Sequence, residues 1–342
     1  MNRNKEIDII KGIAILLMVY GHAIQYSTLA SSDILFNDKI FKLIYTFHMP
    51  LFMIISGFLC YQSFRKYSEV ELVLSRAKSL LIPVAVWSLI PYIKLMNDIE
   101  VGILMGIKKY LGVVVREFWF LWAVFWCTFL VGIVRRYCKD KIICYLIIFI
   151  SMFFIPDVYN FHLYKFMFPF FVIGYLYHKK YHGQDIGVFF SLEKKSEIIG
   201  ILILGALYLV MYYIFDENMY IYASGFSILG KEWGEQIYIN LFRTIIGLTG
   251  SILVVYIFRK LHTVWGERIN TTLSYIGRQS LGVYVLSSNY FLYLNSLLVK
   301  KEEGINYIKP IVETIIIVTA ALGIIKIMAK IPYLGKILLG ER

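Results

Sequence analysis

Apolar runs of about twenty residues recur along the whole sequence, and an α-helix needs a run of this length to cross the ~30 Å hydrocarbon core of a bilayer. Hydrophobic residues make up 59% of the 342 residues and charged residues only 17%, against about 25% in soluble domains. The sequence therefore predicts an all-α fold, a polytopic membrane bundle of about ten transmembrane helices. Residues 1–342 are expected to form a single transmembrane domain, with no soluble domain of useful size.

The distribution of lysine and arginine predicts the orientation of the bundle. With the N-terminus inside, most of the 35 cations fall in the inner segments, as the positive-inside rule requires. Both termini are therefore expected to face the cytoplasm, and we expect a multi-pass protein of the bacterial cytoplasmic (inner) membrane. Because topology accounts for the net charge of +12, no nucleic-acid partner is expected. The expected spans are residues 7–26, 40–62, 76–96, 118–135, 141–156, 163–178, 197–216, 237–258, 274–298 and 309–329.

Cysteine spacing and the common nucleotide and metal motifs exclude several classes of protein. Cys60, Cys127, Cys138 and Cys144 form no C-x-x-C pair and lie in or beside apolar runs, which is typical of free thiols. The sequence has no P-loop, no G-x-G-x-x-G and no H-E-x-x-H. The six histidines show no metal-ligand spacing either, so no metal is expected.

The first span, EIDIIKGIAILLMVYGHAIQY, carries Asp8, Lys11 and His22. Ionisable side chains within a span are costly and usually mark a pathway or a site. Eleven residues separate Lys11 from His22, which returns them to nearly the same helix face about 16 Å apart. A lone intramembrane histidine often makes only a helix-to-helix hydrogen bond, but its alignment with Lys11 favours a functional His22. Lys11 has a simpler interpretation too, as an ion pair with Asp8 that reaches the interface.

The second span contains His48 within YTFHMPLFMIISGFL, followed by Pro50, which is expected to kink the helix. His22 is expected ~22 Å from the inner surface and His48 ~12 Å from the outer surface. In a core of ~30 Å these depths nearly coincide, so the two side chains are expected to meet. A neutral histidine there is suited to take a proton from a hydroxyl. For His48 alone, the residues leave a structural hydrogen bond equally open.

Two further segments favour binding of a ligand. The third span begins with RAKSLLIP, which adds Arg76 and Lys78 at the level of Lys11. Such a cluster suits phosphates, although anchoring to lipid headgroups explains Arg76 and Lys78 as well. The long outer loop 217–236 mixes acidic and aromatic residues, which suits a sugar-like ligand. From the loop alone, an interfacial aromatic belt with solvated charges is the better explanation.

The pattern D-x-x-K-G-x-A-I-L-L, followed by a histidine eleven residues after the lysine, resembles the signature of the acyltransferase-3 family of integral-membrane O-acyltransferases. More particularly it is similar to the fucose-acetylase-like branch. Segments 47–59, 76–83, 118–125, 168–177 and 275–286 resemble that family's recurring segments, in its order. The sequence departs from the family's pattern twice, with Lys11 where arginine is common and Ser287 where histidine is frequent.

The resemblance implies that the domain spanning residues 1–342 is an acyl-CoA-dependent O-acetyltransferase that requires no metal. Acetyl-CoA from the cytoplasm would be the acyl donor, and a sugar hydroxyl of a cell-envelope or exopolysaccharide glycan, or of its lipid-linked precursor, the acceptor. The partners are then acyl-CoA, a carbohydrate or lipid-linked glycan and membrane lipid, and a homodimer is compatible with the sequence. The expected catalytic residues are His22, as general base or transient acyl carrier, and His48, which orients His22 or hydrogen-bonds the thioester carbonyl. The expected donor-binding residues are Lys11, Asp8, Arg76 and Lys78. The expected acceptor-binding residues are Trp119, Glu117 and Ser287.

Two other classes of protein stay open at this point. A transporter or exporter of a polysaccharide or lipid-linked intermediate also suits many spans with buried polar groups, but it should show an inverted repeat, which the sequence lacks. A sensor or structural subunit would leave the alignment of Lys11 and His22 to chance. The choice between acetyl and succinyl, and between direct transfer and a covalent histidine intermediate, also stays open.

Overall fold

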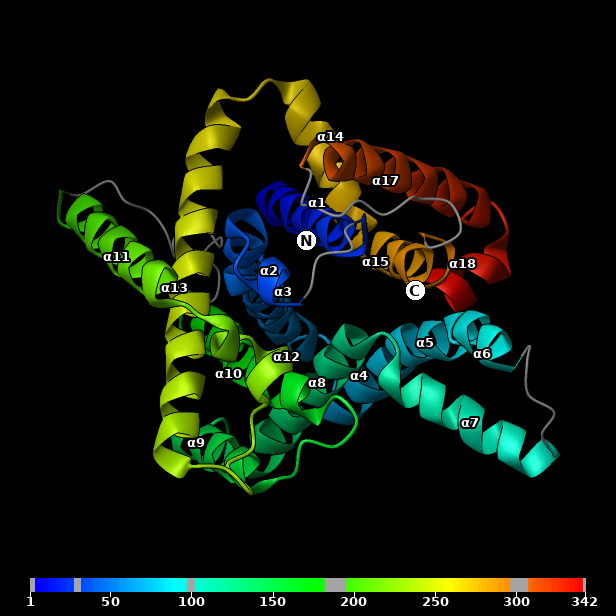
Figure 1. The fold of residues 1–342 in the computed structure, drawn as a ribbon, viewed down its shortest axis with the longest axis horizontal. Helices are drawn as coiled ribbons and strands as arrows, with labels where there is room; N and C mark the ends of the chain where they lie inside the picture. Colours follow the sequence, from blue (N-terminus) through cyan, green and yellow to red (C-terminus); the bar gives the residue numbers. More distant parts are fainter. Residues whose placement is uncertain (1–3, 28–31, 97–101, 182–194, 296–306, 341–342) are drawn as a thin grey trace.

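The computed structural model describes residues 4–27, 32–96, 102–181, 195–295 and 307–340. Within these ranges the regular elements are all helices and no strand is present, which confirms the all-α prediction (Figure 1). In a bilayer a helix satisfies its own backbone hydrogen bonds, so apolar runs adopt this form. The elements are α1 (Lys5–Ser27), α2 (Ser32–Phe36), α3 (Lys39–Phe64), α4 (Glu69–Arg76), the π-helix η1 (Ala77–Leu81), α5 (Ile82–Trp87), α6 (Leu89–Met96), α7 (Ile103–Arg116), α8 (Trp119–Cys138), α9 (Ile142–Ser151), η2 (Met152–Phe154), α10 (Phe161–Lys180), α11 (Lys195–Ile214), η4 (Glu217–Met219), α12 (Ile221–Ser224), α13 (Trp233–Val264), α14 (Glu267–Arg278), α15 (Ser280–Asn289), the π-helix η5 (Tyr290–Leu294), α17 (Ile308–Met328) and α18 (Pro332–Leu339).

Among the described residues, 6 helices are long and apolar enough to cross a membrane: α1, α3, the run from α4 to α6, α8, α13 and α17. Two shorter apolar helices cover Ile142–Phe154 and Ile198–Ile214. The count of ten spans therefore stays a prediction. A helix as short as α9, with 10 residues, is only about 15 Å long. The expected span 274–298 is divided at Gln279 between α14 and α15, and its last residues lie outside the described ranges.

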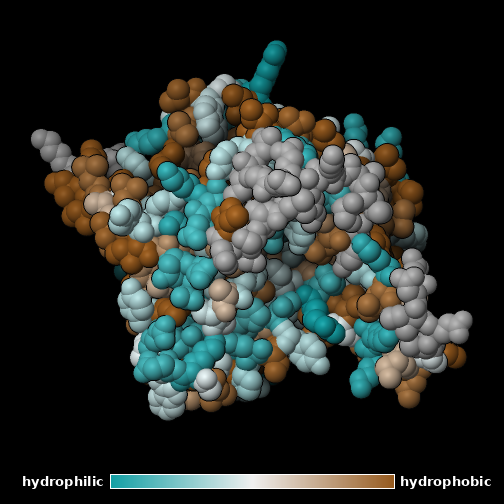
Figure 2. All heavy atoms as spheres, viewed as in Figure 1, coloured by the Kyte–Doolittle hydropathy of each residue, from teal (hydrophilic) through white to brown (hydrophobic). Residues whose placement is uncertain are grey.

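The outward faces of several helices are aliphatic. On α11, Leu202, Ile203 and Leu209 are each more than 60% exposed, and on α17 Ile315 and Ile316 are as well. Figure 2 shows hydrophobic side chains covering the projecting α11, at the left of the view. Water would make such a continuous apolar surface unfavourable, whereas lipid tails solvate it. The protein is therefore an integral membrane protein.

Helix α1 crosses α14 so closely that each helix needs a glycine at the crossing. A Cβ atom added at Gly12 would overlap the backbone carbonyl oxygen of Leu273, and one added at Gly277 would overlap that of Asp8. Small residues allow such close approach of two backbones in a membrane, where van der Waals packing drives helix association. The crossing fixes α1, which carries the predicted first-span residues, against α14.

Helix α3 crosses α10 through a second pair of glycines. A Cβ atom at Gly57 would overlap the carbonyl oxygen of Phe171, and one at Gly174 would overlap that of Ile54. Since α3 also packs against α1 and α13, it lies in the middle of the bundle. This second crossing therefore fixes the helix that carries His48.

Ion pairs join the N-terminal end of α1 to α13 and α14. Lys5 Nζ lies 2.5 Å from a carboxylate oxygen of Glu267, and Glu6 lies 3.6 Å from Arg259 and 3.7 Å from His262. The first turn of α1, the last turns of α13 and the first turn of α14 therefore lie at one end of the bundle. The cytoplasmic location of this end stays a prediction from the distribution of charge.

The α3–α10 crossing can be tested with two glycine-to-alanine variants. We expect Gly57→Ala to destabilise the protein by about 1–3 kcal/mol, because overpacking of a close contact forces the two backbones apart. Gly205→Ala on α11 is the matched control, since a Cβ there would meet nothing within 4 Å. The measurement is the thermal midpoint of the detergent-solubilised protein; equal midpoints for both variants would contradict the crossing.

Candidate functional site

A narrow cavity of about 170 Å³ lies between α1, α3, α8 and the first turn of α15. Its polar lining comes from five residues and the rest of its wall is apolar. We call it the inner cavity, because it begins at Lys11, near the end of α1 that starts at Lys5. The polar residues are Lys11, Ser56, Arg76, Thr128 and Ser280.

Local backbone features bring positive charge to the inner cavity. Arg76 ends α4 and is followed by the π-helix Ala77–Leu81, whose wider turn changes which residues share a face. Ser280 begins α15 directly after the break at Gln279. The backbone N–H groups at a helix N-terminus carry partial positive charge and favour anions. Lys11 and Arg76 make this cavity electropositive.

A second cavity of about 350 Å³ continues along α1, and both His22 and His48 line it. We call it the outer cavity. Met18, Met49 and Tyr284 line both cavities, so the two are adjacent. The wall is rich in aromatic rings and carries a few polar groups. Its further residues include Gln25, Tyr26, Phe36, Phe41, Tyr45, Arg116, Glu117, Phe118, Trp119, Tyr222, Ser288 and Phe291.

The hydrogen bond of His48 defines its tautomer. The side chain is 3% exposed, and Nδ1 lies 2.8 Å from the carbonyl oxygen of Ile44. Because a carbonyl only accepts, Nδ1 carries the proton and Nε2 of the neutral ring holds a lone pair. Neutral His48 therefore accepts a hydrogen bond or a proton at Nε2. Donation to a thioester carbonyl, one of its expected roles, would require the imidazolium.

The imidazole of His22 is held by ring contacts. Its centroid lies 6.2 Å from that of Tyr26 and 5.9 Å from that of Phe291, both in edge-on geometry. Nδ1 is buried and has no hydrogen-bond partner among the residues that the structure describes. A buried nitrogen without a partner is costly, and such groups concentrate at functional sites.

The structure brings most of the predicted site residues to the two cavities. Lys11 and Arg76 line the inner cavity, while Glu117 and Trp119 line the outer cavity with the two histidines. Glu117 interacts electrostatically with Tyr26, which also lines the outer cavity.

Three predicted residues do not line either cavity. Asp8 is 5% exposed and lies at the α1–α14 crossing, whereas Lys78 is exposed on η1. Ser287 is fully buried, and its hydroxyl donates to the carbonyl oxygen of Tyr284 at 3.1 Å. The next residue, Ser288, lines the outer cavity instead. The geometry therefore favours Ser288 as the serine that faces an acceptor.

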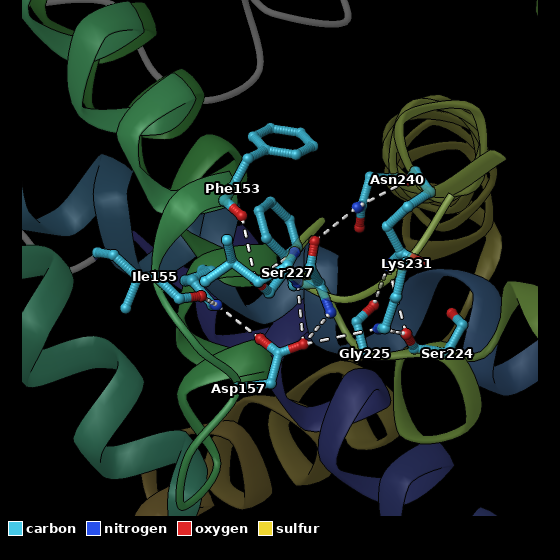
Figure 3. Close-up of polar contacts among 12 residues, drawn as sticks. Phe153, Ile155, Asp157, Ser224, Gly225, Ser227, Lys231 and Asn240 are labelled. Carbon is cyan, nitrogen blue, oxygen red and sulfur yellow. Dashed lines mark hydrogen bonds and ion pairs between the residues drawn. The ribbon is translucent and has the colours of Figure 1, made fainter. Parts of the chain in front are cut away.

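Sequence reasoning missed the anchor of the outer segment that carries Tyr222. Asp157 Oδ2 accepts backbone N–H groups of Phe226 at 2.7 Å and Ser227 at 2.9 Å (Figure 3). Its Oδ1 lies 2.6 Å from Nζ of Lys165, which is 2% exposed on α10. Burial raises the pKa of Asp157, but the hydrogen bonds from Lys165 and the two N–H groups outweigh it and the net shift is downward.

Arg243 on α13 holds the same outer segment from the other side. Its guanidinium is 2% exposed, donates to the carbonyl oxygen of Gly225 at 3.0 Å and to Oγ of Ser224 at 2.5 Å. Lys165 and Arg243 were visible in the sequence as cations within apolar segments, which was a signal for burial. The two anchors fix α12, so that Tyr222 reaches the outer cavity.

The acidic residues at the ends of the outer loop cap helices. The Asp216 side chain accepts the N–H of Asn218 at 2.8 Å at the start of η4, and that of Glu232 accepts the N–H of Glu235 at 2.6 Å at the start of α13. Of the loop 217–236 it is Tyr222 that lines the outer cavity. This loop therefore contributes an aromatic ring to the outer cavity, and the sugar-like ligand stays a prediction.

Comparison with known proteins gives the class of this molecule. A family model described as an acyltransferase domain matches residues 4–330, so the chain belongs to the acyltransferase-3 family and is a membrane acyltransferase. This confirms the resemblance found in the sequence.

Two relatives are nodulation proteins named NolL. The chain is 25% identical to the protein of Mesorhizobium japonicum over 352 residues, covering 99% of this chain and 91% of that relative. It is 34% identical to the protein of Sinorhizobium fredii over 181 residues, covering 52% of this chain and 49% of that relative. No solved structure matches the chain.

The rotation of α15 about its axis can be tested with adjacent serines. We expect Ser288→Cys to react with a small membrane-impermeant thiol reagent added from outside, because this residue lines the outer cavity. Ser287→Cys should not react, since Ser287 is 0% exposed. Labelling is compared with the parent protein, which contains four cysteines. Equal labelling at both positions, or labelling of Ser287→Cys alone, would contradict the geometry.

Proposed function

We propose that this acyltransferase moves an acetyl group from cytoplasmic acetyl-CoA to a sugar hydroxyl of a cell-envelope or exopolysaccharide glycan or its lipid-linked precursor. It would do so in the cytoplasmic membrane of a bacterium. One observation carries the proposal: the two adjacent cavities follow α1 from Lys11 to His22, with Met18, Met49 and Tyr284 lining both. A donor held at one end and an acceptor at the other would meet beside the histidines.

The donor would bind in the inner cavity. Lys11, Arg76 and the N-terminus of α15 favour the phosphates of CoA at its mouth. The apolar wall between Lys11 and Met18 suits an extended pantetheine arm, and the ~16 Å between Lys11 and His22 along the helix matches such a length. Asp8 and Lys78 line neither cavity, so they would contact the donor only where it extends out of the inner cavity.

The acceptor would bind in the outer cavity. Aromatic side chains such as Trp119 and Tyr222 provide flat apolar faces for a sugar ring, and Glu117 and Ser288 provide partners for hydroxyl groups. The family membership and the wall composition support a carbohydrate acceptor.

The reaction uses the histidines as proton acceptors. His22 removes the proton of the sugar hydroxyl while that oxygen attacks the thioester carbonyl carbon. The carbon–sulfur bond then breaks, and the departing thiolate takes the proton from the imidazolium. His48 accepts a hydrogen bond at Nε2 from a second hydroxyl of the same sugar and thereby orients the acceptor, which agrees with the tautomer fixed by Ile44. A transient acyl-imidazole at His22 would satisfy the same geometry.

The role of His22 can be tested by substitution. We expect His22→Ala to lower transfer of radiolabelled acetyl from acetyl-CoA to the glycan by about 10²-fold or more, because a general base contributes 10²–10⁴-fold. Protein level in the membrane should stay unchanged. His262→Ala is the control, since that histidine lies outside both cavities. Substantial residual transfer by His22→Ala would remove the catalytic assignment.

Substitution of Lys11 tests whether this residue binds the donor. We expect Lys11→Ala to raise the KM for acetyl-CoA by roughly tenfold, because it removes one charge-assisted contact to phosphate. Lys11→Arg should keep a KM near that of the native protein. Lys66→Ala, an exposed cation between α3 and α4, serves as the charge-matched control. An unchanged KM in Lys11→Ala would make this lysine structural.

A further inference from the structure

The hairpin of α6 and α7 carries a basic groove that the site described so far does not include. The groove encloses about 520 Å³ and is lined by Lys94, Lys109, Arg116 and Glu117 together with apolar residues. Among the described residues that line the groove, three are cations and one is a carboxylate. A groove of this charge favours a ligand with more than one negative charge.

The two helices of the hairpin pack against each other, and one contact between them is aromatic. The rings of Tyr92 and Tyr110 lie 5.4 Å apart, and the Tyr110 hydroxyl donates to the carbonyl oxygen of Ala85 at 2.6 Å. Gly106 lies buried beside this pair, where an added Cβ would be 3.1 Å from the Tyr92 hydroxyl oxygen. The groove is thus a feature of two packed helices.

On helix α7, Lys109 and Arg116 lie on a different face from several exposed aliphatic residues. Lys109 and Arg116 are seven residues apart and share the face that lines the groove. The opposite face carries Ile103 and Leu104, which are 85% and 83% exposed, and Ile107. An amphipathic helix with an exposed aliphatic face is typical of a membrane boundary. The groove therefore lies next to surface that lipid tails solvate.

The groove borders the outer cavity. Arg116 and Glu117 line both, so a molecule in the groove lies next to the cavity that His22 and His48 line. A ligand that passes from the groove into this cavity would meet cations and then a wall of aromatic rings, with the exposed aliphatic residues of α7 nearby. A matching molecule has an apolar tail, an anionic group and a sugar, in that order.

We propose that Lys94, Lys109 and Arg116 bind the phosphate groups of a lipid-linked glycan acceptor, whose apolar chain lies along α6 and α7. Its sugar then enters the outer cavity beside Glu117. Arginine and lysine recognise phosphate through charge-assisted hydrogen bonds, and arginine also in a bidentate way. The inference rests on the proposed function, because it names the class of acceptor for the same reaction.

Binding of the acceptor's phosphates can be measured without catalysis. The full-length protein, held in nanodiscs of zwitterionic lipid, is titrated with a radiolabelled polyprenyl diphosphate and with the matching phosphate-free polyprenol. We expect the double variant Lys94→Gln/Lys109→Gln to bind the diphosphate about tenfold more weakly and the polyprenol equally well. Lys108→Gln is the matched control, because Lys108 is exposed on α7 but does not line the groove. It should bind both probes as the native protein does.

Two binding outcomes would overturn the proposal. If Lys108→Gln weakened binding as much as the double variant, the effect would be one of general surface charge. If an equal amount of phosphatidylglycerol displaced the polyprenyl diphosphate, the groove would be a site for ordinary lipid headgroups.

A kinetic experiment then separates the subsite from the reaction. With a saccharide linked to polyprenyl diphosphate as acceptor, the double variant should raise the acceptor KM about tenfold. It should leave kcat and the KM for acetyl-CoA unchanged. The rate of acetyl transfer to the phosphate-free glycoside should also stay unchanged. An equal rise with both acceptors would overturn the subsite. If the native protein acetylated no acceptor but still bound the diphosphate through Lys94 and Lys109, the proposed function would fail and the subsite would stand.

Discussion

The close contact of backbones at two glycine crossings is the constraint on which the rest of the structure depends. Gly12 and Gly277 bring α1 against α14, and Gly57 and Gly174 bring α3 against α10. In lipid there is little hydrophobic force between helices, so their relative positions depend on such packing. Because α1 carries His22 and α3 carries His48, each crossing fixes one of the two helices that hold the histidines of the outer cavity.

The same packing separates two kinds of environment along one helix. The inner cavity gathers positive charge from Lys11 and Arg76, while the outer cavity holds two imidazole rings among aromatic side chains, with Arg116 and Glu117 in its wall. Charged groups gain strength in a low-dielectric interior, and an apolar wall around the path excludes water that would hydrolyse a thioester. The arrangement therefore suits a reactant with one charged and one reactive end. The inner and outer cavities would also give a donor and an acceptor different routes to the histidines.

Much of this architecture could be predicted from the sequence, and the exceptions have physical causes. Apolar run length predicted the helices, and the depths of His22 and His48 in their spans predicted that they lie close together; both line the outer cavity. The faces of Ser287 and Lys78 could not be predicted, because the break at Gln279 and the π-helix beside Arg76 change the rotation that a regular helix would give. The position of Tyr222 depends on long-range contacts of its loop, which no local pattern encodes.

The central claim is that donor and acceptor reach the histidines from opposite sides of the membrane. The most direct measurement uses sealed vesicles of known protein orientation, with radiolabelled acetyl-CoA supplied to one face and the glycan acceptor confined to the other. The account predicts labelled glycan only when acetyl-CoA is on the face where α1 begins and the acceptor is on the opposite face. Labelling only when both are on the same face, or with acetyl-CoA supplied from the outer-cavity side, would contradict it.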